Sequence, residues 1–138
     1  TKGKDMVLTP TYYVFKMYNV HQDATYLPLD LNCEVMDVRD NRKVPTVSAT
    51  ASKDKDGKIH ISMSNIDADN AQEITINLPD VKAKKAVGEI LTSANLTDYN
   101  SFENPNNIKL APFKEVKINK GVLKIKLPAK SIVTIELQ

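Results

Sequence analysis

The segment 8–22 near the amino terminus constrains the fold of this chain more than any other feature, because it is the one convincing helix in 138 residues. It reads Leu-Thr-Pro-Thr-Tyr-Tyr-Val-Phe-Lys-Met-Tyr-Asn-Val-His-Gln. Thr9 predicts the N-cap, since its hydroxyl can accept a hydrogen bond from a free backbone N–H of the first turn. Pro10 fits that turn because it has no N–H to leave unpaired.

The predicted helix is apolar on more than one side. Tyr13, Met17 and Val20 fall on one face at helical spacing. Tyr12 and Phe15 lie well round the cylinder from that face. A surface helix usually has one apolar stripe and one polar face, so a helix that is apolar almost all round is expected to be buried on more than one side. We therefore expect this helix to contact a part that the chain itself does not contain.

Short segments with alternating apolar and polar residues follow the helix and predict strands. Asp56-Gly57 and Asn119-Lys-Gly121 are typical of hairpin turns, Pro79-Asp80 ends a strand, and 40–43 reads as a polar loop. The predicted strands lie at 26–31, 34–38 (which also fits an irregular crossing), 47–52, 58–65, 73–78, 87–91, 114–119, 122–127 and 131–137.

Regularly spaced short strands with turn residues between them favour an all-β fold. The predicted fold class is an antiparallel β-sandwich of jelly-roll type preceded by one N-terminal α-helix. The chain is expected to divide into a helical segment with its linker, 1–24, and a sandwich, 25–138. A chain of 138 residues can bury a core large enough to fold without disulfides.

Composition and charge exclude several kinds of partner. The formal net charge is only +2 and the lysines are dispersed, so we expect no nucleic-acid partner. No apolar run approaches the length that spans a membrane, so we expect no membrane partner. Cys33 is the single cysteine, which rules out an internal disulfide. The chain starts at Thr1 rather than Met, which fits a piece of a longer protein, and its compartment stays open between cytoplasm, periplasm and secretion in a bacterium.

Residues that could carry catalysis are few. His21 ends the helix, where its ring can bond the last carbonyl groups. His60 is expected on the solvent face of its strand, with no second histidine beside it. The sequence has no Cys/His pair at metal-ligand spacing, no phosphate-binding glycine loop and no nucleophile elbow. We therefore predict no catalytic residue, no cofactor and no metal ligand in this chain.

Two polar loops, 54–57 and 65–70, carry a weaker calcium hypothesis. Their Asp and Asn oxygens recur at alternate positions, as Ca²⁺ ligands do. Neither loop matches the complete twelve-residue calcium-binding pattern. Because hairpin turns use the same residues for backbone reasons, turn formation is the simpler interpretation.

Sugar binding by the sandwich is the other option. Sugars stack on exposed aromatic rings, and this chain has no Trp. Tyr99 and Phe102 lie in a long loop and are the candidate sugar contacts. Packing of that loop onto the sandwich is the simpler interpretation of these rings.

Three stretches together resemble one family, the α-L-arabinofuranosidases of glycoside hydrolase family 51. Leu8-Thr-Pro-Thr-Tyr-Tyr-Val-Phe-Lys-Met-Tyr18 with Val20-His21-Gln22 resembles the last helix of the family's catalytic barrel. The stretch 96–106, Leu-Thr-Asp-Tyr-Asn-Ser-Phe-Glu-Asn-Pro-Asn, is similar to the family's C-terminal domain, and 127–135 resembles its closing strand. One departure is Tyr13, where the family often carries His.

The resemblance implies that this chain is a fragment. Family members have a (β/α)8 barrel followed by a C-terminal sandwich, so 1–24 would be the last barrel helix and its linker. The catalytic acid/base and nucleophile glutamates would precede Thr1, and the fragment would be inactive. The parent would be a retaining hydrolase that releases terminal α-L-arabinofuranosyl groups from arabinan or arabinoxylan. The expected barrel-packing residues are Tyr12, Tyr13, Phe15, Met17 and Tyr18.

Family sandwiches also take a contribution from the chain before the barrel. Without that contribution a strand edge would be exposed, and exposed apolar helix residues would favour self-association into a homo-oligomer. The leading hypothesis is therefore a non-catalytic accessory domain that stabilises the barrel and the oligomer. The alternative is a carbohydrate-binding module for plant polysaccharide, which surface aromatics near Tyr99 and Phe102 in a groove would favour. A free-standing enzyme would need convergent titratable groups, which the sequence does not offer.

Overall fold

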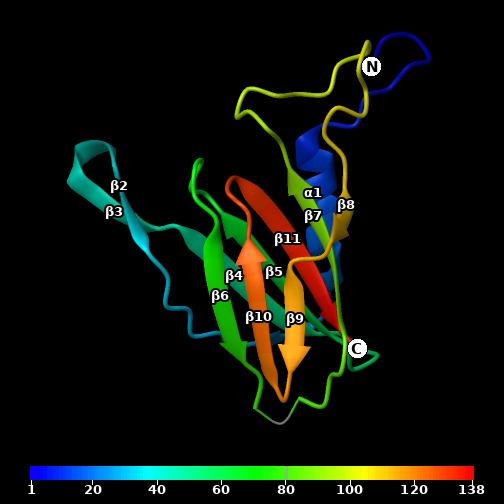
Figure 1. Ribbon diagram of the computed structural model, residues 1–138. Coiled ribbons are helices and arrows are strands. Elements are labelled where there is room, and N and C mark those ends of the chain that lie inside the picture. Colours follow the sequence, from blue (N-terminus) through cyan, green and yellow to red (C-terminus); the bar gives the residue numbers. More distant parts are fainter. Residues whose placement is uncertain (80) are drawn as a thin grey trace.

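The computed structural model describes residues 1–79 and 81–138, in which two antiparallel sheets face each other and one helix covers the outer side of the larger sheet (Figure 1). The helix α1 spans Pro10–Tyr18 and continues into a 3₁₀ turn, η1, at Asn19–His21, while a second such turn, η2, spans Arg39–Asn41. The strands are β1 (Thr25–Leu27), β2 (Val35–Val38), β3 (Arg42–Pro45), β4 (Val47–Lys53), β5 (Ile59–Asn65), β6 (Gln72–Asn77), β7 (Ala86–Thr92), β8 (Ala111–Phe113), β9 (Val116–Asn119), β10 (Val122–Leu127) and β11 (Ser131–Leu137). The predicted antiparallel β-sandwich with one N-terminal helix is confirmed.

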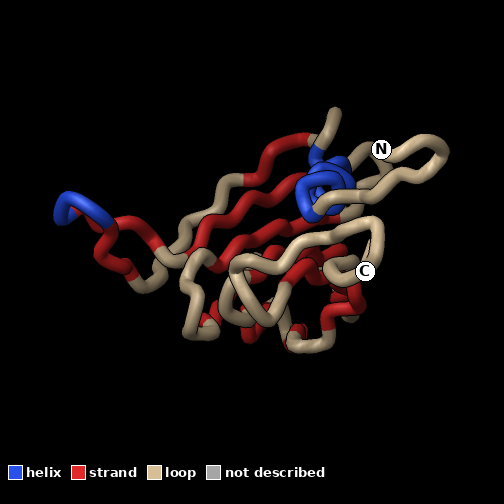
Figure 2. The backbone as a smooth tube through the Cα atoms, turned by 90° about the horizontal axis from the view of Figure 1, so that it is seen from above, coloured by secondary structure: helices blue, strands red, loops and turns tan. Residues whose placement is uncertain are grey.

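The two sheets differ in size. The larger sheet has six strands in the order β1-β4-β5-β11-β7-β8, and the smaller has three in the order β6-β10-β9. The hairpin β2-β3 forms a separate two-stranded ribbon that projects from the side of the sandwich (Figures 1 and 2). In the view from above, this ribbon lies at the opposite end of the molecule from α1 and the N-terminus (Figure 2).

The main core lies between the two sheets and follows from the period-two alternation of the strands. On β11, Val133, Ile135 and Leu137 point inward, and the register places Ile135 beside Ile61 of β5 and Gly88 of β7. The smaller sheet contributes the inward-facing apolar residues of β6 and β10, namely Ile74, Ile76, Leu123, Ile125 and Leu127.

A second, smaller core joins α1 to the outer face of the large sheet. Met17 of α1 packs with Leu91 of β7 and with Ile108, all of them buried. The Thr9 hydroxyl accepts a hydrogen bond from the Tyr12 N–H at 3.4 Å, as the predicted N-cap requires. The Asn100 amide donates to the Leu8 carbonyl at 2.8 Å, and this bond joins the long loop to the start of the helix.

Two local predictions are wrong, and one short strand was not predicted. Residues 40–43, expected as a polar loop, contain part of η2 and the start of β3, because Asp40 and Asn41 both adopt left-handed conformations that reverse the chain and let β3 pair with β2. The expected strand 26–31 ends at Leu27, since Pro28 has no N–H for the ladder. The short strand β8 was not expected. The strand end at Pro79-Asp80 cannot be compared in full, as Asp80 lies outside the described residues.

Among the residues that the structure describes, no helix combines the length and the apolar character needed to cross a membrane.

Candidate functional site

The helix α1 exposes two large aromatic side chains on the side that faces away from the sheet. Phe15 is 75% exposed and Tyr12 is 47% exposed. The Tyr12 and Tyr13 rings meet edge to face, with centroids 5.5 Å apart, so part of the Tyr12 ring already packs within the helix. We call Tyr12 and Phe15 the docking face. Exposed aromatic area on a helix is a feature of surfaces that bind another protein or domain.

The other three predicted barrel-packing residues lie closer to the sheet. Met17 is 2% exposed and packs in the second core, so it has no surface left for another domain. Tyr13 and Tyr18 are half-buried at the edge of that core. Burial raises the pKa of the Tyr18 hydroxyl above its ordinary value. Of the five residues, Phe15 is therefore largely exposed and Tyr12 about half exposed, while Tyr13 and Tyr18 are exposed only in part.

A polar network joins η1 to the outer face of the large sheet. The His21 Nδ1 atom lies 2.7 Å from the Ser52 hydroxyl of β4, and its Nε2 atom lies 2.8 Å from the Ser62 hydroxyl of β5. Ser62 in turn meets the Thr134 hydroxyl of β11 at 2.9 Å. The expectation that His21 bonds the last helix carbonyls is wrong, because the 3₁₀ turn carries its ring onto the two serines.

His60 is buried rather than exposed, which corrects the second histidine prediction. Its strand does turn His60 away from the core between the sheets, but α1 and η1 cover that face. The His60 Nε2 atom lies 2.9 Å from the Asp54 carboxylate. A hydrogen bond from His60 is the largest of the effects that hold the pKa of Asp54 below its ordinary value. The helical segment that covers this face lies far from His60 in sequence, so its contact leaves no signal in local alternation.

The contacts of His21 with its two serines and of His60 with Asp54 do not form a catalytic relay. Both ring nitrogens of His21 are occupied by serines, while the carboxylate belongs to His60. A nucleophilic serine needs one histidine that contacts the serine and the carboxylate together. The geometry instead fixes η1 against β4 and β5, so we assign these residues a structural role.

The contact between η1 and the sheet is expected to weaken in mild acid. Burial, followed by the positive charge that His60 can carry, lowers the pKa of His21 in the folded protein below its ordinary value of about 6.5. The unfolded chain then takes up a proton first as the pH falls. Stability from His21 is fully present above about pH 6.5 and is lost as the pH falls through the folded pKa.

Thermal unfolding of the isolated chain between pH 5 and pH 8 measures this effect. We expect the melting temperature to fall below pH 6.5, and we expect His21→Gln to reduce that slope. The Asp54 carboxyl contributes in a separate window, below its ordinary pKa of 3.8. An unchanged slope in His21→Gln would show that another group controls stability in this range.

Hydrogen-bond donors of the protein occupy the side-chain oxygens of the two proposed calcium loops. Asp54 Oδ1 accepts from the Asp56 and Lys58 backbone N–H groups, and its Oδ2 faces His60. Asp67 Oδ1 accepts from the Asp69 and Asn70 backbone N–H groups. These are turn-forming contacts. In the described part of the chain, no group of three or more His, Cys, Asp or Glu side chains is placed to hold a metal ion.

Every carboxyl group with a shifted pKa in the described part of the chain has a lowered pKa, which is unfavourable for a general acid. A carboxylic acid that donates a proton to a leaving group needs a raised pKa. Here hydrogen bonds to the carboxylates lower the pKa values of five such groups, Asp54, Asp67, Asp98, Glu103 and Glu136.

The candidate sugar contacts Tyr99 and Phe102 are exposed, by 69% and 41% respectively. The simpler interpretation, that this loop packs its rings onto the sandwich, is therefore wrong for Tyr99. A cavity of about 580 Å³ next to the loop is lined by Leu96, Leu91 and Ile132, but by neither ring. Both rings are therefore exposed on the surface, and neither lines this cavity.

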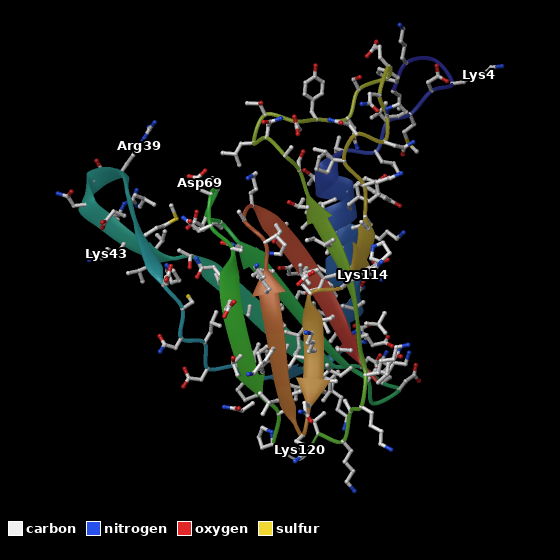
Figure 3. All side chains as sticks on the ribbon, in the orientation of Figure 1. Lys4, Arg39, Lys43, Asp69, Lys114 and Lys120 are labelled. Carbon is white, nitrogen blue, oxygen red and sulfur yellow. The ribbon has the colours of Figure 1, made fainter. Side chains whose placement is uncertain are left out.

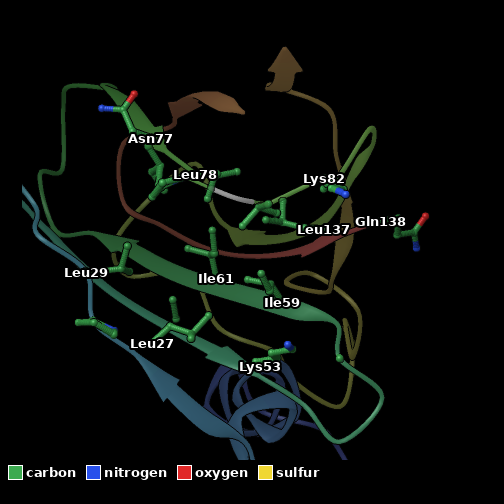
Figure 4. A pocket seen from close by; sticks show the side chains of 17 residues that line it. Leu27, Leu29, Lys53, Ile59, Ile61, Asn77, Leu78, Lys82, Leu137 and Gln138 are labelled. Carbon is green, nitrogen blue, oxygen red and sulfur yellow. The ribbon is translucent and has the colours of Figure 1, made fainter. Parts of the chain in front are cut away.

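An apolar opening lies at one end of the sandwich, between the two sheets. Its volume is about 630 Å³, and it extends to the chain end at Gln138. Leu27, Leu29 and Ile61 point into it from one side and Leu78 from the other (Figure 4). The neighbouring strand β6 pairs with β10 alone among the described strands, so its other edge is free. No local pattern in the sequence predicts this opening, which arises because a sheet of three strands faces a sheet of six.

Comparison with known proteins gives consistent matches over most or all of the chain. A family model described as the α-L-arabinofuranosidase C-terminal domain matches residues 1–131. An intracellular exo-α-L-arabinofuranosidase from Bacteroides ovatus is 80% identical over all 138 residues, which make up 27% of that protein. The chain therefore spans about a quarter of the length of this relative.

Solved structures agree with the sequence matches. The family 51 arabinofuranosidase from Xanthomonas axonopodis pv. citri superimposes with a TM-score of 0.95 at 36% identity, over 100% of this chain and 28% of that one. A family 51 α-L-arabinofuranosidase from Bifidobacterium longum superimposes with a TM-score of 0.85 at 20% identity, over 96% of this chain and 26% of that one, a likeness of fold alone.

Proposed function

The chain belongs to the family of α-L-arabinofuranosidase C-terminal domains, and from this premise we propose that it is the non-catalytic accessory sandwich of a larger arabinofuranosidase. In this proposal, residues 1–24 supply the last helix of a (β/α)8 barrel with its linker, and residues 25–138 form the sandwich. Its role is to stabilise the barrel and the assembled oligomer. The observation that carries the proposal is the docking face, two aromatic side chains that the chain's own sheet does not cover.

The two sides of α1 differ in burial, and this difference supports contact with a second domain. One side of the helix already packs on β7 through Met17, and the opposite side exposes Phe15. Most of the stability of a short helix comes from the packing of its apolar face, and a helix with apolar side chains on both sides is typical of one that is covered on both sides. The barrel of the parent chain would cover the second side.

The opening at the end of the sandwich supports a second link to the parent. A free strand edge beside an apolar cavity is suited to one further strand, which would pair with β6 and bury side chains against Leu29 and Leu78. We propose that a segment from before the barrel occupies this place. The sandwich would then be joined to the barrel at both ends of the barrel's sequence.

The parent's chemistry is proposed to lie outside this chain. We propose that the parent is a retaining hydrolase that releases terminal α-L-arabinofuranosyl groups from arabinan or arabinoxylan, through two glutamates on earlier barrel strands. The lowered carboxyl pKa values described above support the proposal that this domain supplies no catalytic carboxyl group.

A carbohydrate-binding module is the second candidate function, favoured by the exposure of Tyr99 and Phe102. We expect the isolated chain to show no turnover of a chromogenic arabinofuranoside, and no retardation by arabinan or arabinoxylan in affinity electrophoresis. The full-length parent, assayed beside it, is expected to turn the substrate over. Retardation that is lost in Tyr99→Ala would replace the accessory role with a binding module, and turnover by the isolated chain would overturn both.

A further inference from the structure

A groove runs beside α1 on the outer face of the large sheet, and we call it the side groove. It is the cavity of about 580 Å³ next to the long loop. Its floor is apolar and buried, and is made by Leu91 of β7 and by Ile108. One wall is α1, through Val14, and the rim carries two exposed apolar side chains, Ile66 at 52% and Leu96 at 75%.

The loop that carries Leu96 is held in place by its own side chains. The Asp98 carboxylate accepts a hydrogen bond from the Ser93 hydroxyl. The Asn100 amide donates to the Leu8 carbonyl at 2.8 Å, which fixes the loop against the start of α1. The walls of the side groove are therefore arranged before any partner binds, and this lowers the cost of binding one.

The polar side chains that line the side groove are already bonded within the chain. The Thr92 hydroxyl donates to the Lys130 carbonyl at 3.1 Å, and the Lys130 ammonium donates to the Ala68 carbonyl at 2.7 Å. Within the described residues, the same is true of the other polar side chains of the lining except Thr11, namely Ser64, Asn65, Ser93, Asn95, Asp98 and Ser131. Because a sugar is held by hydrogen bonds from its site, an apolar occupant fits the side groove better.

The side groove borders the docking face. Thr11 lines the groove, and Phe15 lies one helical turn further along the same side of α1. A partner that covers Phe15 would therefore reach the rim of the groove as well.

The part of the parent outside this domain would join at this end of the molecule. The matched family is a C-terminal domain, and the chain makes up 27% of the Bacteroides ovatus relative, so the remainder precedes it. The N-terminus, the start of α1 and the long loop lie together at one end (Figure 1). Figure 3 shows Lys4 at this end, with Arg39 and Lys43 of the β2-β3 hairpin on the far side.

The architecture of a (β/α)8 barrel says what would lie along the flank of α1. Its helices form an outer ring around the strands, so the last helix has another helix on each flank. In the proposed parent, the sheet covers one side of α1, the barrel strands cover the docking face, and a helix lies on either flank. The side groove occupies one of these flanks, between α1 and the loop that carries Leu96.

We propose that the side groove receives apolar side chains from the barrel helix that neighbours α1 in the ring of the same parent chain. This proposal rests on the proposed function, in which α1 is the last barrel helix. It adds a contact between barrel and sandwich, and it assigns Ile66 and Leu96 to that contact rather than to a sugar or a second copy.

The test places a thiol on the rim of the side groove in the full-length parent and measures its rate of reaction with a maleimide. Leu96→Cys and Ile66→Cys each keep a small apolar side chain at the rim. Val35→Cys is the matched control, because Val35 is 57% exposed and lies on β2, at the opposite end of the molecule from α1 (Figure 2). Labelled peptides are identified by mass, which separates the new thiols from Cys33 and the parent's other cysteines.

Both rim thiols are expected to react at least about tenfold more slowly than the control thiol, since thiol reactivity depends on access. Within this chain alone Leu96 is more exposed than Val35, so slower labelling requires a cover from elsewhere in the parent. Protection that persists after dilution to single copies, as measured by light scattering, and without added arabinan would support the barrel helix as the occupant.

Rim thiols that react as fast as the control would overturn the proposed contact. Protection that is lost on dilution to single copies would replace the barrel helix with a second copy, and protection that appears only with arabinan would replace it with a sugar. Activity on a chromogenic arabinofuranoside is recorded in the same preparations. An active parent with unprotected rim thiols would contradict the groove contact alone, whereas an inactive wild-type parent would contradict the proposed function.

Discussion

Ile135→Ala is expected to lower the free energy of unfolding of the isolated chain by about 2–5 kcal/mol. Ile135 is fully buried in the middle of β11, the strand with β5 on one side and β7 on the other. The substitution removes three carbon atoms from the core between the sheets and leaves a cavity. Both neighbouring strands are held by full hydrogen-bonded ladders, so the space cannot close by a shift of one strand.

Because of the surroundings of Ile135, we expect the loss in the free energy of unfolding to lie in the upper part of this range. The residue beside it on β7 is Gly88, which has no side chain to move into the cavity. The Phe113 side chain already occupies the space next to Gly88, since a Cβ atom built there would lie 3.1 Å from it.

Urea unfolding followed by circular dichroism measures the change in the free energy of unfolding. Val87→Ala is the control, because Val87 lies on the exposed outer face of the neighbouring strand, and it is expected to change stability by less than about 1 kcal/mol. Equal effects of the two substitutions would mean that the central core does not lie where the strand alternation places it.

The strands of the main core are the part that the sequence predicts best. Alternation along 58–65, 122–127 and 131–137 predicts which side chains point inward, and β5, β10 and β11 confirm it. Local alternation suffices here because burial of one face fixes both the strand and its register.

Features that depend on a partner distant in sequence were not predicted. His60 was assigned to solvent because alternation tells which side of a strand a residue faces, but not what covers that side. The strand β3 was missed because its apolar content is low and it forms only by pairing with β2. The opening beside Leu29 and Leu78 has no local signal at all, since it results from the unequal size of two sheets.

The sequence predicts that the docking face lies apart from the buried stripe of the helix, but not which of the two sides is buried. The helical period placed Tyr12 and Phe15 away from the stripe of Tyr13 and Met17, and the structure exposes the first pair and buries Met17. The sequence could not say which of the two sides would contact the chain's own sheet. That choice depends on Leu91 and Ile108, which are more than 70 residues away in sequence.

Phe15→Asp is expected to leave the stability of the isolated chain nearly unchanged and to destabilise the full-length parent. In the isolated chain Phe15 is 75% exposed, so the free energy of unfolding is expected to change by less than about 0.5 kcal/mol. In the parent, a covered Phe15 contributes about 1.5–3 kcal/mol through burial of its ring. An unpaired carboxylate in the same place adds a desolvation penalty, so the expected loss there is at least about 3 kcal/mol.

Thermal unfolding and limited proteolysis of both proteins measure this difference. We expect the parent variant to melt at a lower temperature and to be cleaved between barrel and sandwich, while the isolated chain keeps its melting temperature. Asn119→Asp provides the same new charge on an exposed position of β9, at the other edge of the smaller sheet from β6, and is expected to change neither protein. If Phe15→Asp leaves the parent as stable as Asn119→Asp does, then α1 does not contact the barrel through this ring, and the accessory role would have to rest on the β6 edge and the side groove alone.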